Sequence, residues 1–127
     1  MEELIRALLK STPEIAAIAG DRVNFGAHPQ GQPYPAILLN VVSNIEGYLI
    51  NAPSGLSQAR IQVDCDANDY ASSKFLSRAA LTALSGYSAG RIQGVFHAGS
   101  RDYHEGGSNV PDRPFRVSLD FMITYNN

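Results

Sequence analysis

Two aspartates near the middle of the chain have the spacing best suited to metal chemistry. Asp64 and Asp66 fall on the same side of an alternating segment, and Asp69 follows shortly after them. Paired carboxylates at this spacing can hold a divalent cation through oxygen ligands, as in a small metal-dependent hydrolase. A half-buried strand, however, places polar residues at alternate positions on its solvent face without any chemistry. We therefore favour a polar outer sheet face and expect neither a metal nor a cofactor.

The histidines give a weaker chemical signal. His97 and His104 lie seven positions apart in one predicted strand, so an unbroken pleat would point them to opposite faces, and His28 lies in a proline-rich loop. Asp102, His104 and Glu105 could form an acid–base group with a nearby serine, yet the chain has no Gly-x-Ser-x-Gly motif. These patterns do not predict an enzyme.

Cys65 is the single cysteine, so one chain can form neither an internal disulfide nor a cysteine-based metal site. The alternation of its segment places it on the inward side, where it acts as a small apolar residue. A reactive thiol stays open as an alternative, because a helix is predicted to begin a few residues further on.

The composition bounds the class of protein. The 127 residues predict a single domain, 1–127, and the net charge of −2 comes with a charged fraction of 17%, against roughly 25% in typical soluble domains. A surface so poor in charge argues against nucleic acid as the main partner and fits contacts with other proteins. No apolar run is long enough to span a membrane, and acidic residues stand where a signal peptide would be basic, which predicts a cytoplasmic protein.

A strand followed by a helix forms the centre of the predicted fold. Residues 53–55 predict a turn, Ala59–Asp66 alternates with period two, and the following segment changes to helical spacing. Asn68 is expected to cap this long helix, and Gly86 is expected to end it in a left-handed conformation. Its apolar stripe, which should cover a sheet, is formed by Leu76, Ala80 and Leu84.

The same patterns assign the remaining segments. Thr12 and Pro13 predict that a second short helix begins directly after the first and ends at Gly20. The strand after the long helix should turn Ile92, Phe96 and Ala98 inward. The other expected elements are a helix over Glu2–Lys10, a brief extended segment at Asp21–Val23, and strands over Ala36–Glu46, Arg91–Glu105 and Phe115–Tyr125. The last of these should lie beside either Ala59–Asp66 or Arg91–Glu105.

These elements together predict an α+β domain. We expect a mostly antiparallel sheet of four to five strands, with the long helix and the short N-terminal helix pair packed on one face. Two long loops, 47–57 and 99–114, are predicted to lie at its ends. The first loop is apolar for a loop, which is typical of a contact surface, although folding back over its own core is an equal alternative.

The order of these segments resembles one known family. The opening helix pair ends in Ala-Gly-Asp-Arg-Val, the loop Pro29–Ala36 leads into a strand, Gly55–Cys65 precedes Asp-Tyr-Ala and the long helix, and the chain finishes with Arg116–Phe121. This arrangement is similar to the small tail completion or tail terminator proteins of long-tailed phages and of phage-derived gene transfer agents. The likeness covers nearly the whole chain.

The resemblance implies a structural virion protein without catalysis or cofactor. Such a protein forms a ring, commonly a homohexamer, at the head-proximal end of the tail tube, where it stops tube polymerisation and meets the neck or head-completion protein. DNA could pass through the ring without specific contacts. The implied location is the host cytoplasm during assembly and then the tail–neck junction of the virion.

Interface residues are predicted from the two long loops and from the outer face of the sheet. The tube or neck should contact the loops, and neighbouring subunits should contact the sheet. The predicted interface residues are Tyr48, Leu49, Ile50, Leu56, Arg60, Asp64, Arg101, Tyr103 and Arg113. Three other functions stay open: a neighbouring head–tail connector such as an adaptor or stopper, a small metal-dependent hydrolase, and a monomeric module that binds a small apolar ligand.

Overall fold

Three helices and five strands form in the described part of the chain, which a computed structural model places for residues 1–26, 33–48, 53–104 and 115–126. The predicted α+β class is confirmed. In chain order the elements are α1 (Glu2–Ser11), α2 (Pro13–Ala19), β1 (Val23–Phe25), β2 (Ala36–Tyr48), β3 (Pro53–Ala67), α3 (Tyr70–Leu84), β4 (Ile92–His104) and β5 (Phe115–Asn126).

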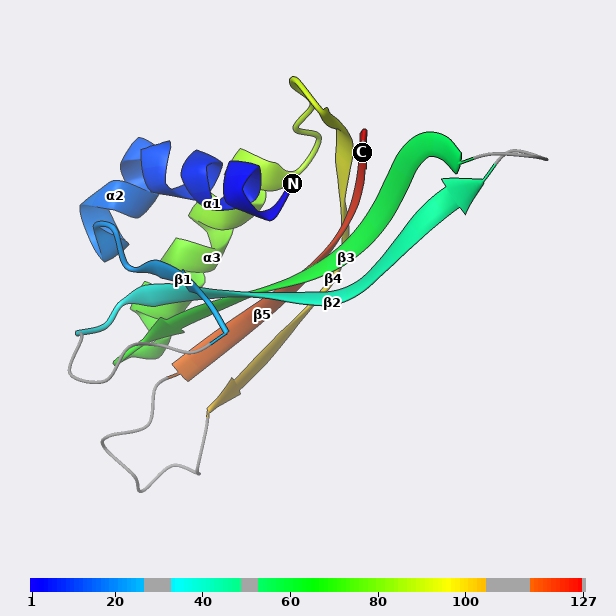
Figure 1. Cartoon of the computed structure of the whole chain (residues 1–127). Coiled ribbons are helices and arrows are strands. Elements are labelled where there is room, and N and C mark those ends of the chain that lie inside the picture. The colour runs from blue at the N-terminus through cyan, green and yellow to red at the C-terminus, as the bar shows by residue number, and fades with distance from the viewer. Residues whose placement is uncertain (27–32, 49–52, 105–114, 127) are drawn as a thin grey trace.

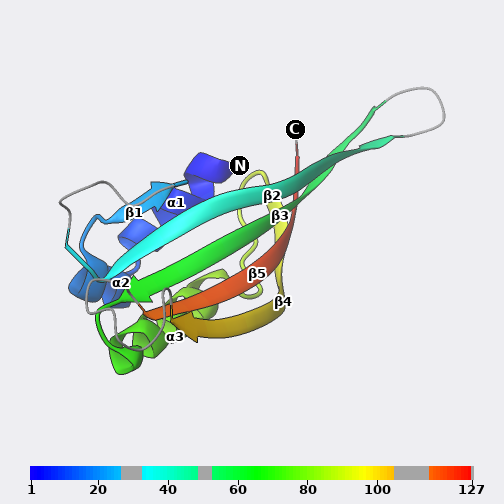
Figure 2. The ribbon, with the colours of Figure 1, turned by 90° about the horizontal axis from the view of Figure 1, so that it is seen from below.

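The strands form one sheet in the order β1-β2-β3-β5-β4. Only β1 and β2 run parallel, and every other neighbouring pair is antiparallel. The sequence left two neighbours open for β5, and the structure gives it both, because β5 pairs with β3 on one side and with β4 on the other (Figure 2). The cleanest alternating segment of the chain is therefore an interior strand.

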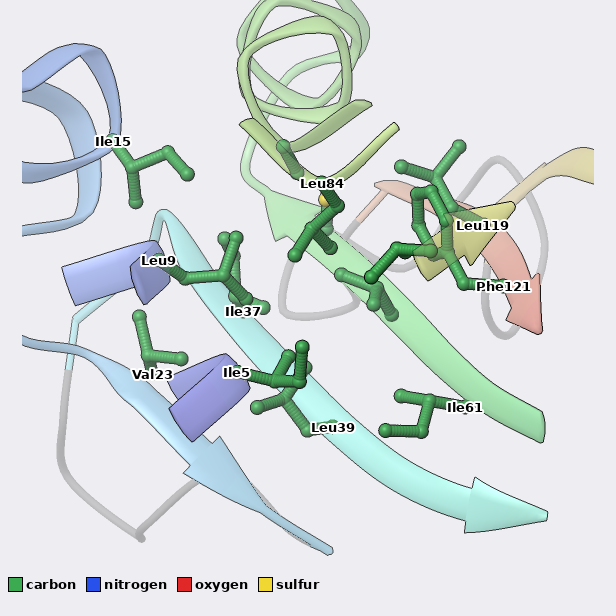
Figure 3. Packing of buried hydrophobic residues seen from close by; sticks show 14 of the residues in the cluster. Ile5, Leu9, Ile15, Val23, Ile37, Leu39, Ile61, Leu84, Leu119 and Phe121 are labelled. Atoms are coloured by element: carbon green, nitrogen blue, oxygen red, sulfur yellow. The ribbon is translucent and has the colours of Figure 1, made fainter. Parts of the chain in front are cut away.

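All three helices cover the same face of this sheet (Figure 1). The core lies between the two layers, and Figure 3 shows side chains from α1, α2, α3 and the strands meeting there. Each large apolar side chain removed from water contributes roughly 1.5–3 kcal/mol. The largest fully buried side chains include Phe121, Ile5, Leu9, Ile15, Ile37, Leu39, Ile61, Leu76 and Leu84.

The helix ends follow their capping residues, with one correction. Asp69, rather than the predicted Asn68, caps α3, because its carboxylate accepts the backbone N–H of Ser72 at 2.9 Å and the Ser72 hydroxyl at 2.8 Å. Gly86 follows the helix at φ 78°, the left-handed conformation that was predicted. Pro13 opens α2 directly after Thr12, as expected.

The predicted loop over 47–57 is mostly strand. β2 continues to Tyr48 and β3 starts at Pro53, and these two residues pair across the hairpin, so the turn predicted at 53–55 is wrong. The pairing of β2 with β3 extends over this length with two register shifts, one between Val41 and Ser43 and one between Glu46 and Tyr48. The described ends of β2 and β3 project beyond the rest of the domain as a two-stranded arm (Figures 1 and 2).

Bulges in β4 also change which side chains share a face. The register shifts between Ile92 and Gly94 and again between His97 and Gly99. As a result His97 stands opposite Phe121, and His104 stands opposite Phe115, six positions away on β5. The unbroken pleat assumed for the two histidines is therefore wrong, since one residue of β4 is taken up by the bulge between them.

Candidate protein–protein interface

The face of the sheet that carries no helix, called the open face below, is the main candidate surface. On β3 the buried residues Ile61, Val63 and Cys65 turn toward the helices, so the residues between them turn to the open face. Figure 2 looks onto this side. Its polar and charged residues on β3, β4 and β5 include Arg60, Gln62, Asp64, Asp66, Arg101, Arg116, Ser118 and Asp120.

One arginine holds the two aspartates that were considered as metal ligands. The Arg116 guanidinium donates to both oxygens of Asp66, from Nε to Oδ1 at 2.8 Å and from Nη2 to Oδ2 at 2.9 Å. Its Nη1 lies 3.9 Å from Oδ2 of Asp64, and the other carboxylate oxygen of Asp64, Oδ1, accepts hydrogen bonds from Ser118 and from Gln62. Charge-assisted, bidentate contacts of this kind are among the stronger polar interactions in proteins.

This network changes the interpretation of Asp64 and Asp66. Both lie on the predicted outer face, but they are only 2% and 1% exposed. Asp64 is therefore not exposed to solvent as a residue on a wet sheet face would be, because Arg116, Ser118 and Gln62 surround its carboxylate, and its contact with a neighbouring subunit stays a prediction. The described residues contain no group of three or more acidic, histidine or cysteine side chains that could hold a metal ion. The geometry thus gives the hydrolase hypothesis no support.

The part of the open face around Asp120 carries more positive than negative charge. Oδ2 of Asp120 lies 3.4 Å from Nη2 of Arg60 and 4.0 Å from Nη2 of Arg101, so two guanidiniums share one carboxylate oxygen. Their side chains are 48% and 60% exposed. Most of their donor groups consequently face solvent and are available to a partner.

Exposed apolar side chains lie close to these arginines, at paired positions of neighbouring strands. Phe96 of β4 stands opposite Met122 of β5, and Met122 stands opposite Arg60 of β3. Phe96 is 63% exposed, and Val42, in the bulge of β2 that faces Arg60, is 55% exposed. An exposed aromatic ring beside two exposed arginines is the composition found at the centre of protein interfaces.

The inward orientation predicted for Phe96 is wrong, and the bulge at the start of β4 is the reason. The register shift after Ile92 turns Val95 into the core, where it is fully buried, and puts its neighbour Phe96 on the open face. Gly94 leaves room for the ring, since a Cβ added there would lie 3.1 Å from Cε2 of Phe96. The two glycines near the bulges, Gly94 and Gly99, were the only sequence signal for this change.

Three of the remaining predicted interface residues have a described backbone, on the arm or at the far end of β4. The backbone of Tyr48 ends β2, that of Leu56 lies in β3 opposite Asn126, and that of Tyr103 lies in β4 opposite Arg116. Leu49, Ile50 and Arg113 lie outside the described residues.

The side chain of Asp102 makes a structural contact with α3. Its Oδ2 accepts hydrogen bonds from Nζ of Lys74 at 2.7 Å and from the hydroxyl of Tyr70 at 2.7 Å. The Lys74 contact and then the Tyr70 contact hold the pKa of Asp102 below its usual range, and the bond to Asp102 raises the pKa of Lys74. The side chain that was considered for an acid–base group thus links β4 to α3.

Cys65 lies in the core as predicted. It is fully buried, and its backbone carbonyl accepts the Ser73 hydroxyl at 2.7 Å. Burial, together with the nearby charges of Asp66 and Asp64, raises the pKa of the thiol far above its usual range. Because the thiolate is the reactive form, this cysteine has the properties of a packing residue.

The family described as tail completion protein gp17 matches residues 3–126, almost the entire chain. The protein belongs to this tail completion family. Its fold also resembles a chain in the structure titled "Virion of native gene transfer agent (GTA) particle", with a TM-score of 0.72 and 20% sequence identity over 97% of this chain and 92% of that chain. No curated protein matches the sequence.

Family membership confirms the predicted resemblance and places the protein among the structural components of phage-type tails. The described part of the chain contains no helix with the length and hydropathy needed to cross a membrane. The open face and the β2–β3 arm are the candidate surfaces for contacts with other virion proteins.

Proposed function

We propose that this protein assembles into a homo-oligomeric ring, of six subunits as the resemblance implies, at the head-proximal end of the tail tube. The ring stops tube polymerisation and joins the tail to the neck or head-completion protein. The observation that carries the proposal is the family match over residues 3–126. The protein would act in the host cytoplasm during assembly and then remain at the tail–neck junction of the virion.

The sheet edges support a ring. β1 pairs with only three residues of β2, Ile37 to Leu39, so the described remainder of β2 is one open edge. β4 forms the opposite edge over its 13 residues. Two different surfaces on opposite sides of one subunit can form a head-to-tail contact, and such contacts generate a ring when the rotation closes.

The β2–β3 arm supports contacts beyond the neighbouring subunit. It leaves the sheet where β5 ends, at the pair of Leu56 and Asn126, and projects past the helix layer (Figure 2). We propose that the arm, whose described residues include Tyr48 and Leu56, contacts the tail tube protein or the neck protein, and that Leu49 and Ile50, outside the described residues, take part in the same contact. The end of β4 and the segment after it, with Tyr103 and Arg113, form the second proposed contact region.

Tube growth in the presence of the protein tests this function. The tail tube protein of the same particle is polymerised with and without the purified chain, and tube lengths and ends are measured by electron microscopy. We expect shorter tubes with added ring density at one end. A chain that binds the portal or the capsid neck but never a tube end would be an adaptor or stopper, and that result would contradict the terminator function.

A further inference from the structure

A charged cleft lies between α1 and the edge strand β1. The helix runs beside the strand (Figure 2), and the cleft that they form has a volume of about 830 Å³. Ligand pockets commonly measure about 300–1,000 Å³, so a short stretch of peptide can fit there. The residues that matter below are Glu3, Arg6, Ala7 and Lys10 of α1 and Asn24 and Phe25 of β1. We call it the α1–β1 cleft.

Two cations of α1 line this cleft without a carboxylate partner. Arg6 and Lys10 are one helical turn apart, so they lie on the same side of α1. Nε of Arg6 donates to the backbone carbonyl of Val23 at 2.6 Å, which fixes the guanidinium at the edge of β1. Within the described chain neither cation is at ion-pair distance from an acidic group, and Glu3 supplies a single negative charge to the lining. The cleft therefore has a net positive charge, and the Nη groups of Arg6 and the ammonium of Lys10 can contact a ligand.

The backbone of Phe25 adds one donor and one acceptor. The carbonyl of Arg22 and the N–H of Gly26 both bond to β2. Backbone groups along a strand point alternately to its two sides, so those of Val23 and Phe25 point away from β2. The contact of Arg6 with the Val23 carbonyl agrees with this direction. In the part of the chain that is described, the N–H and C=O of Phe25 have no hydrogen-bond partner, and the side chain of Phe25 is 40% exposed.

We propose that the α1–β1 cleft binds a short extended segment of another virion protein, and that this segment carries a carboxylate side chain. The backbone of the segment exchanges two hydrogen bonds with Phe25, as an added strand does at a sheet edge. The carboxylate lies between the Nη groups of Arg6 and the Nζ of Lys10, where both contacts are charge-assisted. An apolar residue two positions away, on the same face of the segment, covers the ring of Phe25. This site goes beyond the proposed ring and does not depend on it.

The charges of the described strands favour a different protein over a second copy as the occupant. Each aspartate of β3, β4 and β5 lies within ion-pair distance of a cation of its own chain, and would have to give up that contact to enter a neighbour's cleft. A partner with a free acidic segment has no such cost. The aspartates concerned are Asp64, Asp66, Asp102 and Asp120.

Two synthetic peptides that differ at one position test the site. The probes are the fluorescently labelled peptide Thr-Thr-Val-Thr-Glu-Thr-Val-Thr-Thr and the same peptide with lysine in place of its glutamate. Fluorescence polarisation should show the acidic peptide binding at least about tenfold more tightly than the basic one. Lys10→Glu should remove this preference, because it reverses a charge that the carboxylate contacts. The matched control Arg78→Glu changes an exposed cation of α3 outside the cleft and should leave both affinities unchanged. Circular dichroism shows that each variant is folded.

Nuclear magnetic resonance of the labelled protein then locates the peptide. The amide signals of Asn24 and Phe25 should shift on titration, since the peptide bonds to this edge. Failure of both peptides to bind, equal affinity for the two, or shifts confined to the open face would each overturn the site.

Binding to the tail tube protein and to the neck protein of the same particle identifies the occupant. Lys10→Glu should weaken binding to one of them by about tenfold, whereas Arg78→Glu should not. If Lys10→Glu weakens self-association and neither of these contacts, the occupant is a second copy and the proposal is wrong; an unchanged affinity for both proteins also overturns it. Tubes that are capped normally by a chain unable to bind the acidic peptide would overturn this site and leave the ring function standing.

Discussion

The buried contact between Arg116 and its two aspartates yields the sharpest test of the structure. Replacing Arg116 with Met keeps an unbranched apolar stem and removes the guanidinium that Asp64 and Asp66 share. Those carboxylates are 2% and 1% exposed, and removing one partner of a buried ion pair costs about 3–5 kcal/mol. The total stability of a domain is only about 5–15 kcal/mol. We therefore expect Arg116→Met to be one of the most destabilising single changes on the open face.

Urea unfolding followed by far-ultraviolet circular dichroism measures this loss, since the chain has no tryptophan to report by fluorescence. With a urea slope of about 2 kcal/mol/M, the midpoint should fall by roughly 1.5–2.5 M. The matched control is Arg101→Met. The side chain of Arg101 is 60% exposed and lies 4.0 Å from its carboxylate, so its loss should cost less than about 1 kcal/mol.

A double-mutant cycle with Asp66→Asn separates the ion pair from the other contacts of Arg116. If the pair carries the effect, the double variant is more stable than the sum of the two single changes predicts, by more than about 0.5 kcal/mol. Strict additivity, or an Arg116→Met variant no less stable than Arg101→Met, would refute the reasoning.

Three further expectations follow from single contacts. Asp69→Ala should lower the melting temperature, because the cap of α3 is lost. The backbone N–H and the hydroxyl of Ser72 hold the pKa of Asp69 below its usual value. The stabilisation from this cap is therefore complete above about pH 4 and should disappear as the pH falls through the lowered pKa. Melting curves of wild type and variant across acidic pH measure this loss. Gly86→Ala should lower the free energy of unfolding in urea by about 1 kcal/mol, because Gly86 has a φ of 78°. Gly99→Ala should lower it little, because φ is negative there and an added Cβ meets nothing within 4 Å. Equal losses would contradict this account. Cys65 should react with a thiol reagent only at the rate of unfolding, and rapid labelling of the native protein would show that the strand is not packed as described.

The sequence predicted the elements whose side-chain period is unbroken. The alternation of Ala59–Asp66 and Phe115–Tyr125 and the helical stripe of Leu76, Ala80 and Leu84 each follow the repeat of their element. Burial of one face of each element is enough to produce such a pattern. The α+β class and the helices on one face of the sheet follow from these elements alone.

The candidate interface was only partly predictable, because bulges and distant partners decide it. A single extra residue in β4 reverses which of Val95 and Phe96 is buried, and glycine is only a weak signal of a bulge. The burial of Asp64 depends on Ser118 and Arg116, more than fifty positions further along the chain. Arg60 and Arg101 were predicted to be interface residues, but their shared carboxylate, Asp120, appears only when β3, β5 and β4 are placed side by side.

The interior position of β5 has a consequence for how the subunit forms. β3 and β4 are synthesised earlier, yet neither pairs with the other, because both pair with the strand that follows them all in chain order. During translation the β2–β3 hairpin and α3 can form early, while β4 has no strand to join until β5 emerges. We expect the sheet to close late and in one cooperative step, with the slow kinetics typical of long-range strand pairing. A chain interrupted before β5 would lack the whole Asp120 and Arg116 side of the open face and would leave β3 and β4 without the strand that joins them.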